Sequence, residues 1–145
     1  PNYHTVSGDL AAAIREQRGL VYLPHPFDII RRSTIVTASI AAIIDQVDII
    51  EVLNSRVLWP YNNRAALRLA EAHGIPGGAG SDAHTPGEIG RAYVVVPRCD
   101  LADPQSFLIA VRQGRVAGGT SSPLRHPVTL VAKLIKRLGL APRTP

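Results

Sequence analysis

The sequence contains 145 residues, of which 46% are hydrophobic and 19% are charged, proportions typical of a folded globular domain. They exclude a disordered chain, a collagen-like repeat and a coiled-coil rod, and no apolar run reaches the ~20 residues that a membrane span needs. The net charge of +5 arises at one end: residues 1–103 carry nine arginines and eleven acids, whereas residues 104–145 carry seven basic residues and no acid. A nucleic-acid partner would therefore meet the C-terminal stretch.

The ends and the single cysteine bear on the origin of the chain. The sequence has no methionine and begins at Pro1, which predicts a piece of a longer protein. Cys99 is the only cysteine, which excludes an internal disulfide and a cysteine-rich zinc module. One reduced cysteine suits a reducing compartment, so we expect a cytoplasmic protein.

In chain order, the pattern predicts helices that alternate with short buried strands. Ser7 is expected to cap a helix that continues to Gln17 and stops at Gly19. The segments that follow are a strand over 20–23, an apolar segment over 35–44, a strand over 47–53, a helix over 63–73, a strand over 75–80, a strand over 92–96 and a helix over 104–113. This alternation implies parallel βα units, and hence a barrel or a doubly wound sheet.

The sequence changes character after the glycine- and serine-rich segment 118–123. A basic amphipathic helix is predicted in the tail over 123–145. Its apolar face is Val131, Leu134, Ile135 and Leu138, and its basic flank is Lys133, Lys136 and Arg137. We expect the apolar face to pack on the rest of the chain or on a second copy in a homo-oligomer; contact with a membrane surface or nucleic acid is the alternative.

Candidate metal ligands follow two of the predicted strands. Asp82 and His84 lie two residues apart after the strand over 75–80, so in extended chain their side chains point the same way. His25 follows the strand over 20–23 between two prolines that restrict its backbone. A carboxylate and imidazoles at the carboxyl ends of parallel strands suit zinc, manganese or iron. The alternative is that these residues occupy ordinary surface turns.

A carboxylate also interrupts the apolar strand over 47–53. A buried Glu51 costs free energy unless it is paired or bound to metal, so it either pairs with an internal arginine or supports a metal site. Asn54 and Arg56 lie just beyond it on the same rim. There Arg56 is placed to hold a phosphate oxygen.

The remaining candidates have ordinary structural explanations. His73 before Gly74 is typical of a helix C-terminus. Close strand packing explains the glycines at 77, 78 and 80 better than a phosphate loop, because no Lys-Ser or Lys-Thr follows. His126 lies in the basic tail, and Cys99 has no histidine near it in sequence, so no nucleophilic triad is predicted.

Four segments together resemble the C-terminal half of the PHP family (polymerase and histidinol phosphatase), which are metal-dependent phosphoesterases. These segments are 23–28, 50–56, 62–66 and 74–90, with the closest matches at 19–28 and at 73–76 leading into 80–85 and 88–90. The resemblance runs from about residue 8 to residue 122. We take residues 1–122 as the C-terminal portion of a PHP-type barrel and residues 123–145 as a separate basic tail.

The resemblance implies a fold and a site. The fold would be part of a distorted seven-stranded (β/α) barrel with parallel strands, followed by the basic helix. The site would hold two or three zinc, manganese or iron ions. It implies that His25, Asp82 and His84 are metal ligands, that Asp82 and His84 act in catalysis, and that Glu51 and Asn54 lie behind the ligands.

The implied reaction is hydrolysis of a phosphate monoester, or of a nucleotide or oligonucleotide phosphate, by metal-activated water, with Arg56 on the phosphate. The family's opening His-x-His motif is not matched here: Asn2 stands where its first histidine would be, near His4. The rival interpretation is a non-catalytic module with an incomplete metal site that binds a partner protein or nucleic acid.

Overall fold

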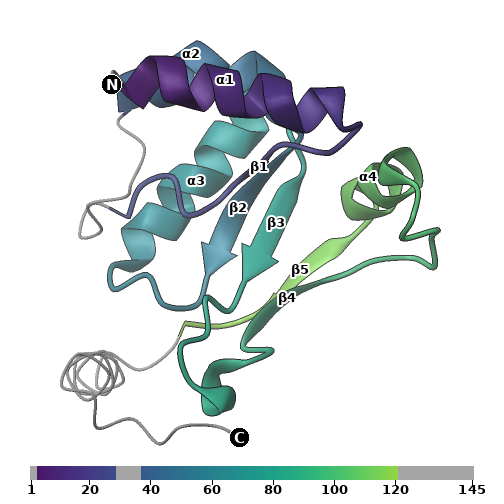
Figure 1. Ribbon diagram of the computed structural model, residues 1–145. Helices are drawn as coiled ribbons and strands as arrows, with labels where there is room; N and C mark the ends of the chain where they lie inside the picture. Colours follow the sequence, from purple (N-terminus) through teal and green to yellow (C-terminus); the bar gives the residue numbers. More distant parts are fainter. Residues whose placement is uncertain (1–2, 29–36, 121–145) are drawn as a thin grey trace, which may run out of the picture.

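The computed structural model describes residues 3–28 and 37–120 of the chain (Figure 1). The basic amphipathic helix predicted over 123–145 lies outside them. The elements in order are α1 (Tyr3–Glu16), β1 (Tyr22–Leu23), α2 (Thr37–Ile43), a 3₁₀ turn (Ile44–Gln46), β2 (Ile49–Asn54), α3 (Pro60–His73), β3 (Gly77–Gly80), a 3₁₀ turn (Pro86–Glu88), β4 (Ala92–Val95), α4 (Pro104–Arg112) and β5 (Arg115–Gly118). None of the helices in this described part is long and apolar enough to cross a membrane.

The strands form two small sheets. β1, β2 and β3 pair in parallel in that order, which confirms the parallel units expected from the sequence. β4 pairs with β5 in antiparallel fashion, so the prediction of a further parallel strand over 92–96 is wrong. The described residues thus form an open mixed α/β arrangement, and they show neither a closed barrel nor seven strands.

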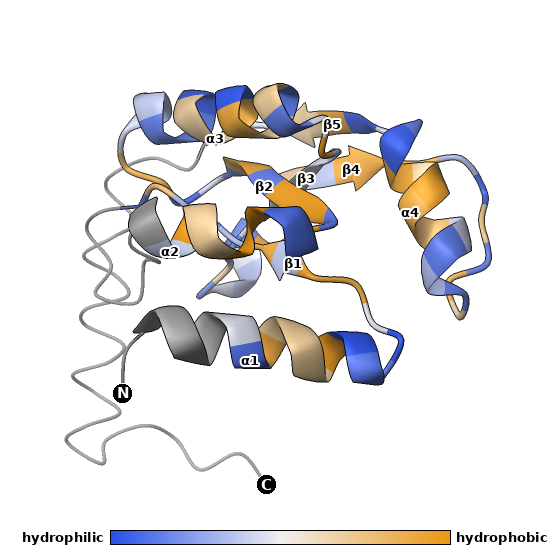
Figure 2. Ribbon diagram, turned by 90° about the horizontal axis from the view of Figure 1, so that it is seen from above, coloured by the Kyte–Doolittle hydropathy of each residue, from blue (hydrophilic) through white to orange (hydrophobic). Residues whose placement is uncertain are grey.

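The two faces of β2 pack against different helices. Successive strand residues point to opposite faces, so Ile50 and Val52 share one face and Ile49 and Glu51 the other. Ile50 and Val52 belong to the main apolar cluster, to which α1, α2 and α3 also contribute. Figure 2 shows α1, α2 and α3 grouped around β2, with α4 set apart from them beyond β4. Ile49 instead packs with α4, so the face that carries Glu51 looks toward α4 and the β4–β5 ribbon.

Helix ends show where local sequence decides the structure. Gly74 ends α3 in the left-handed conformation (φ 61°), and the amide of Ile75 donates to the Ala70 carbonyl over 2.9 Å, as predicted for this C-terminus. α1 differs from its prediction, because it starts at Tyr3 rather than at a Ser7 cap. After α1 the chain turns at Arg18, whose φ is 58°. The next residue is Gly19, where a Cβ would lie only 2.9 Å from Ile14 Cγ2.

Candidate functional site

The site lies at the carboxyl ends of β1, β2 and β3. Since these strands are parallel, their carboxyl ends meet at one edge of the sheet, where the arrowheads of β2 and β3 point together in Figure 1. His25 follows β1, Asn54 ends β2 and Asp82 follows β3. The topology therefore brings three of the residues singled out in the sequence to the same edge.

Asn54 connects two carboxylates at this edge. Its side-chain nitrogen donates to Glu51 Oε2 over 3.1 Å and lies 3.4 Å from Asp82 Oδ2. Glu51 Oε2 also accepts the backbone N–H of His25 over 2.7 Å. Glu51 was expected either to pair with an internal arginine or to support a metal site. Its described contacts are these hydrogen bonds, and through Asn54 its carboxylate joins the segments that follow β1 and β3.

The position of Asn54 is itself fixed on every side. Its backbone N–H donates to Asn63 Oδ1 over 3.1 Å, and Asn63 Nδ2 returns a bond to the Asn54 carbonyl over 3.0 Å. Its Oδ1 accepts from the backbone N–H of Arg56 over 2.9 Å. The side chain is 1% exposed, so these bonds replace the water that a buried amide loses. Asn63, on α3, was not singled out from the sequence.

Glycines let Glu51 and its neighbours approach β3. A Cβ on Gly80 would lie 2.1 Å from Glu51 Oε1, and a Cβ on Gly78 would lie 2.5 Å from the Tyr22 ring. A Cβ on Gly77 would lie 2.8 Å from Val52 Cγ2. Close strand packing is thus confirmed as the reason for these glycines.

The backbone is strained at two of the predicted ligands. His25 has φ of 23° and Asp82 has φ of 48°, both in a region that residues other than glycine rarely enter. Each such residue costs roughly 1–3 kcal/mol, which other contacts must offset, and strain of this kind clusters at functional sites.

The loop after Asp82 folds back on itself. His84 Nδ1 lies 2.8 Å from the Asp82 carbonyl oxygen and 3.8 Å from its carboxylate Oδ1. The structure therefore brings Asp82 and His84 together, but through a turn at Asp82, whose φ is 48°, rather than through the extended chain that the spacing assumed.

A buried ion pair supports this loop. Glu88 is fully buried, and its Oε2 accepts from the backbone N–H of His84 over 3.0 Å and from the N–H and Oγ1 of Thr85, each over 2.9 Å. Its Oε1 pairs with the guanidinium of Arg56, which is itself 5% exposed. Burial alone would raise the pKa of Glu88, but the hydrogen bonds from His84 and Thr85 and the charge of Arg56 lower it to about 2.

Sequence reasoning matched residues 88–90 to the family but gave Glu88 no role, although a signal for one was present. Thr85-Pro86-Gly87-Glu88 has the Thr-x-x-Glu pattern of a capping box, and the structure forms that box. Arg56 was expected to hold a phosphate oxygen. In the structure its guanidinium is engaged by Glu88, so the contact with phosphate stays a prediction.

Comparison with known proteins bears on this edge. Residues 60–116, which include α3, β3 and the Asp82–Glu88 loop, match the family model described as PHP-associated. The match supports a PHP-family C-terminal region over these residues.

Two further proteins are similar to this chain. An uncharacterized protein of Methanocaldococcus jannaschii is 32% identical over an alignment of 124 residues, and the match covers 79% of this chain and 52% of that protein. The crystal structure of PsfC from Pseudomonas syringae matches 89% of this chain and 50% of its own with a TM-score of 0.52 and 25% identity. The chain therefore spans about half the length of each relative.

The carboxyl edge of the β1–β3 sheet fits a metal ion in the kind of its donors. The Nδ1 atom of His25 is buried and has no hydrogen-bond partner, while Asp82 and His84 offer a carboxylate and an imidazole. In number the donors fall short: within residues 3–28 and 37–120, no three His, Cys, Asp or Glu side chains come close enough to hold an ion. His25 is linked to Asp82 through Glu51 and Asn54, and joint ligation stays a prediction.

Proposed function

We propose that this chain supplies the C-terminal part of the active site of a metal-dependent phosphoesterase of the PHP type. The observation that carries the proposal is the buried hydrogen-bond network that joins Glu51, Asn54 and Asp82 in a PHP region. A buried carboxylate such as Glu51 costs free energy unless it is hydrogen-bonded, paired or bound to metal, and the carboxyl ends of parallel strands are where barrel active sites form. In the complete protein, the parallel sheet β1–β3 would be part of the distorted seven-stranded barrel.

The metal would be zinc, manganese or iron, with His25, Asp82 and His84 as ligands and the others outside this chain. Such an ion supplies a Lewis acid for the phosphate and an acidified water. Within this chain, the Nδ2 of Asn54 orients the Asp82 carboxylate. The carboxylate of Glu51 holds the His25 segment by accepting the backbone N–H of His25. These bonds fix the donors before substrate arrives, so no reorganisation is needed in the transition state.

The reaction is hydrolysis of a phosphate monoester, or of a nucleotide or oligonucleotide phosphate. The water oxygen forms a new bond to phosphorus, the bond from phosphorus to the ester oxygen breaks, and the leaving alcohol takes up a proton. Asp82 and His84 are the residues of this chain that we place at the reacting atoms. Arg56 would reach the phosphate only by sharing or leaving its pairing with Glu88.

The test is phosphate release by the full-length protein from a chromogenic ester and a panel of nucleotides. We expect activity that depends on Mn²⁺ or Zn²⁺, is lost with a chelator, and falls by at least about 100-fold in Asp82→Ala. Asp45→Ala is the matched control, because Asp45 is exposed near α2. Full-length protein that stays inert with every divalent metal would contradict the proposal.

A non-catalytic module is the second candidate. Within the described residues no three-ligand group is formed, which is the observation that favours it. Metal analysis of the full-length protein separates the two: about two bound ions per chain support the enzyme, whereas none together with no phosphate release supports the binding module, through a partner protein or nucleic acid.

A further inference from the structure

Glu88 stands apart from the reacting groups but contacts the segment that carries one of them. It is completely buried, so neither a metal ion nor substrate reaches its carboxylate. One oxygen binds the guanidinium of Arg56, and the other accepts three hydrogen bonds from His84 and Thr85. The carboxylate is therefore anchored on one side and holds the loop on the other.

The geometry of the His84 ring fixes where its proton lies. Nδ1 is 2.8 Å from the Asp82 carbonyl oxygen, and a carbonyl oxygen only accepts hydrogen bonds. Nδ1 must therefore carry the hydrogen, and Nε2 of the neutral ring keeps its lone pair. A metal-bound histidine is commonly oriented in this way, by a hydrogen bond from its other ring nitrogen.

The contact between His84 and Asp82 needs a tight loop, and Glu88 provides it. Asp82 is in the left-handed conformation, so the loop has no regular structure to hold it. The backbone N–H of His84 is bound by Glu88, and the Asp82 carboxylate is bound by Asn54. With the backbone of His84 and the side chain of Asp82 held in this way, Nδ1 of the ring meets the Asp82 carbonyl oxygen.

We infer that Glu88, anchored by Arg56, is the positioning residue of His84: it holds the loop so that Nδ1 donates to the Asp82 carbonyl and Nε2 is left as the nitrogen for a ligand. The ligand in question is the divalent metal ion, so the purpose of the device rests on the proposed function. The device itself is a property of this chain without metal.

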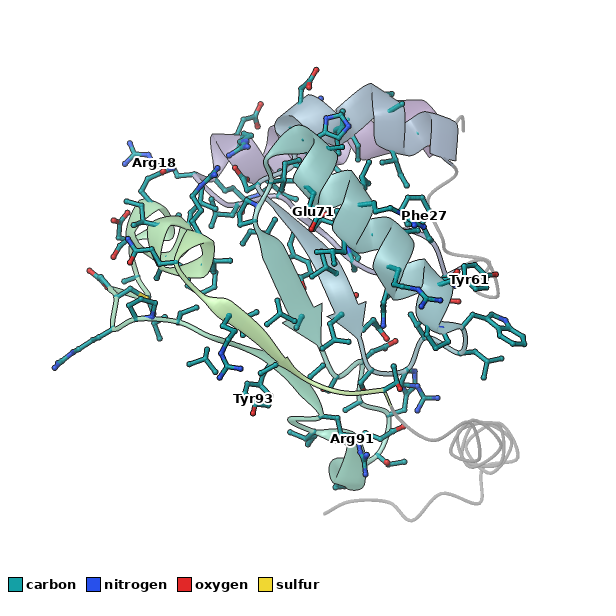
Figure 3. The ribbon with its side chains drawn as sticks, turned by 180° about the vertical axis from the view of Figure 1, so that it is seen from behind. Arg18, Phe27, Tyr61, Glu71, Arg91 and Tyr93 are labelled. Atoms are coloured by element: carbon teal, nitrogen blue, oxygen red, sulfur yellow. The ribbon has the colours of Figure 1, made fainter. Side chains whose placement is uncertain are left out.

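The test is therefore made without metal. Long-range ¹H–¹⁵N NMR of the His84 ring, on the chain in chelator at mildly alkaline pH, reports which nitrogen carries the hydrogen. We expect a single tautomer with hydrogen on Nδ1, and its loss to a mixture of tautomers in Glu88→Gln. Glu71→Gln makes the same chemical change at an exposed position on α3 (Figure 3), and it should leave the His84 signals unchanged.

Two results would overturn the inference: hydrogen on Nε2 in the unsubstituted chain, or a His84 tautomer that stays pure in a folded Glu88→Gln variant. Where Glu88→Gln does not fold, Arg56→Lys loosens the anchor while keeping its charge, and the same mixture is expected. In full-length protein, Glu88→Gln should weaken Zn²⁺ binding by about 10–100-fold. Full-length protein that binds no metal would contradict the proposed function, whereas the tautomer result would stand.

Discussion

Replacing Gly80 with alanine tests whether Glu51 is as tightly held as its hydrogen bonds indicate. The new Cβ would lie 2.1 Å from Glu51 Oε1, whereas a carbon and an oxygen in contact keep about 3.3 Å, so the carboxylate must retreat by about 1 Å. An exposed glutamate would swing away at little cost. Glu51 is 5% exposed and its other oxygen is bound at 2.7 Å to His25 N and at 3.1 Å to Asn54 Nδ2. The movement therefore breaks at least one of these bonds.

The cost follows from these contacts. Crowding a packed site costs about 1–3 kcal/mol, and losing a hydrogen bond to a charged group adds about 1.5–3 kcal/mol, so we expect Gly80→Ala to lower the free energy of unfolding by about 2.5–6 kcal/mol. Urea denaturation measures it. Gly8→Ala is the control, because a Cβ there meets nothing within 4 Å and Gly8 lies inside α1, where alanine should stabilise by about 0.5–1 kcal/mol. A Gly80→Ala variant as stable as the unsubstituted chain would show that Glu51 has room to move.

Three further predictions use the same denaturation assay. Glu88→Gln should cost about 3–5 kcal/mol at neutral pH by breaking the buried pair with Arg56. Because the pKa of Glu88 is lowered to about 2 from 4.5, its contribution is complete above pH 4.5 and is lost as the pH falls toward 2, so a penalty that stays constant over this range would refute the pairing. Asn54→Asp puts a third carboxylate between Glu51 and Asp82, so it should lower the free energy of unfolding by at least about 2 kcal/mol at neutral pH and by less in acid. An equal loss at neutral and at acid pH would argue against the bridge. Gly74→Ala should cost about 1 kcal/mol, because φ there is 61°, and no loss would contradict the left-handed cap.

Local pattern was sufficient for the elements whose partners are near in sequence. β1, β2 and β3 are short apolar runs after helices, and the structure places parallel strands in each run. The end of α3 was also predictable, since a glycine directly follows its last apolar turn. In these cases the residues that decide the conformation lie within one or two turns of the element they form.

β5 was missed because its partner lies beyond a helix. Arg115–Gly118 has four residues and only partly buried apolar side chains, so its composition does not differ from that of a loop. It is a strand because Val116 and Ala117 pair with Val94 and Tyr93 across α4. The same pairing turns β4 antiparallel, which the alternation of helices and strands did not indicate.

The candidate site shows the same division between local and distant contacts. The positions of His25, Asp82 and His84 at strand ends follow from local pattern. The groups that hold them do not, because Arg56 meets Glu88 across 32 residues and His25 meets Glu51 across 26. The chain fold determines that Glu51 holds the His25 segment and that Arg56 anchors Glu88, whereas the contact of Glu88 with its own loop is a local capping box.

One arrangement of contacts occurs twice at this edge. The backbone N–H of His25 donates to the buried carboxylate of Glu51, and that of His84 donates to the buried carboxylate of Glu88. Each carboxylate in turn is bound by a residue at the end of β2, Asn54 in the first case and Arg56 in the second. A backbone N–H fixes the position of a residue without using its side chain, so both imidazoles stay available. The end of β2 thereby sets the positions of donors on both neighbouring segments, and the strain at His25 and Asp82 is offset by bonds that converge on residues 54–56.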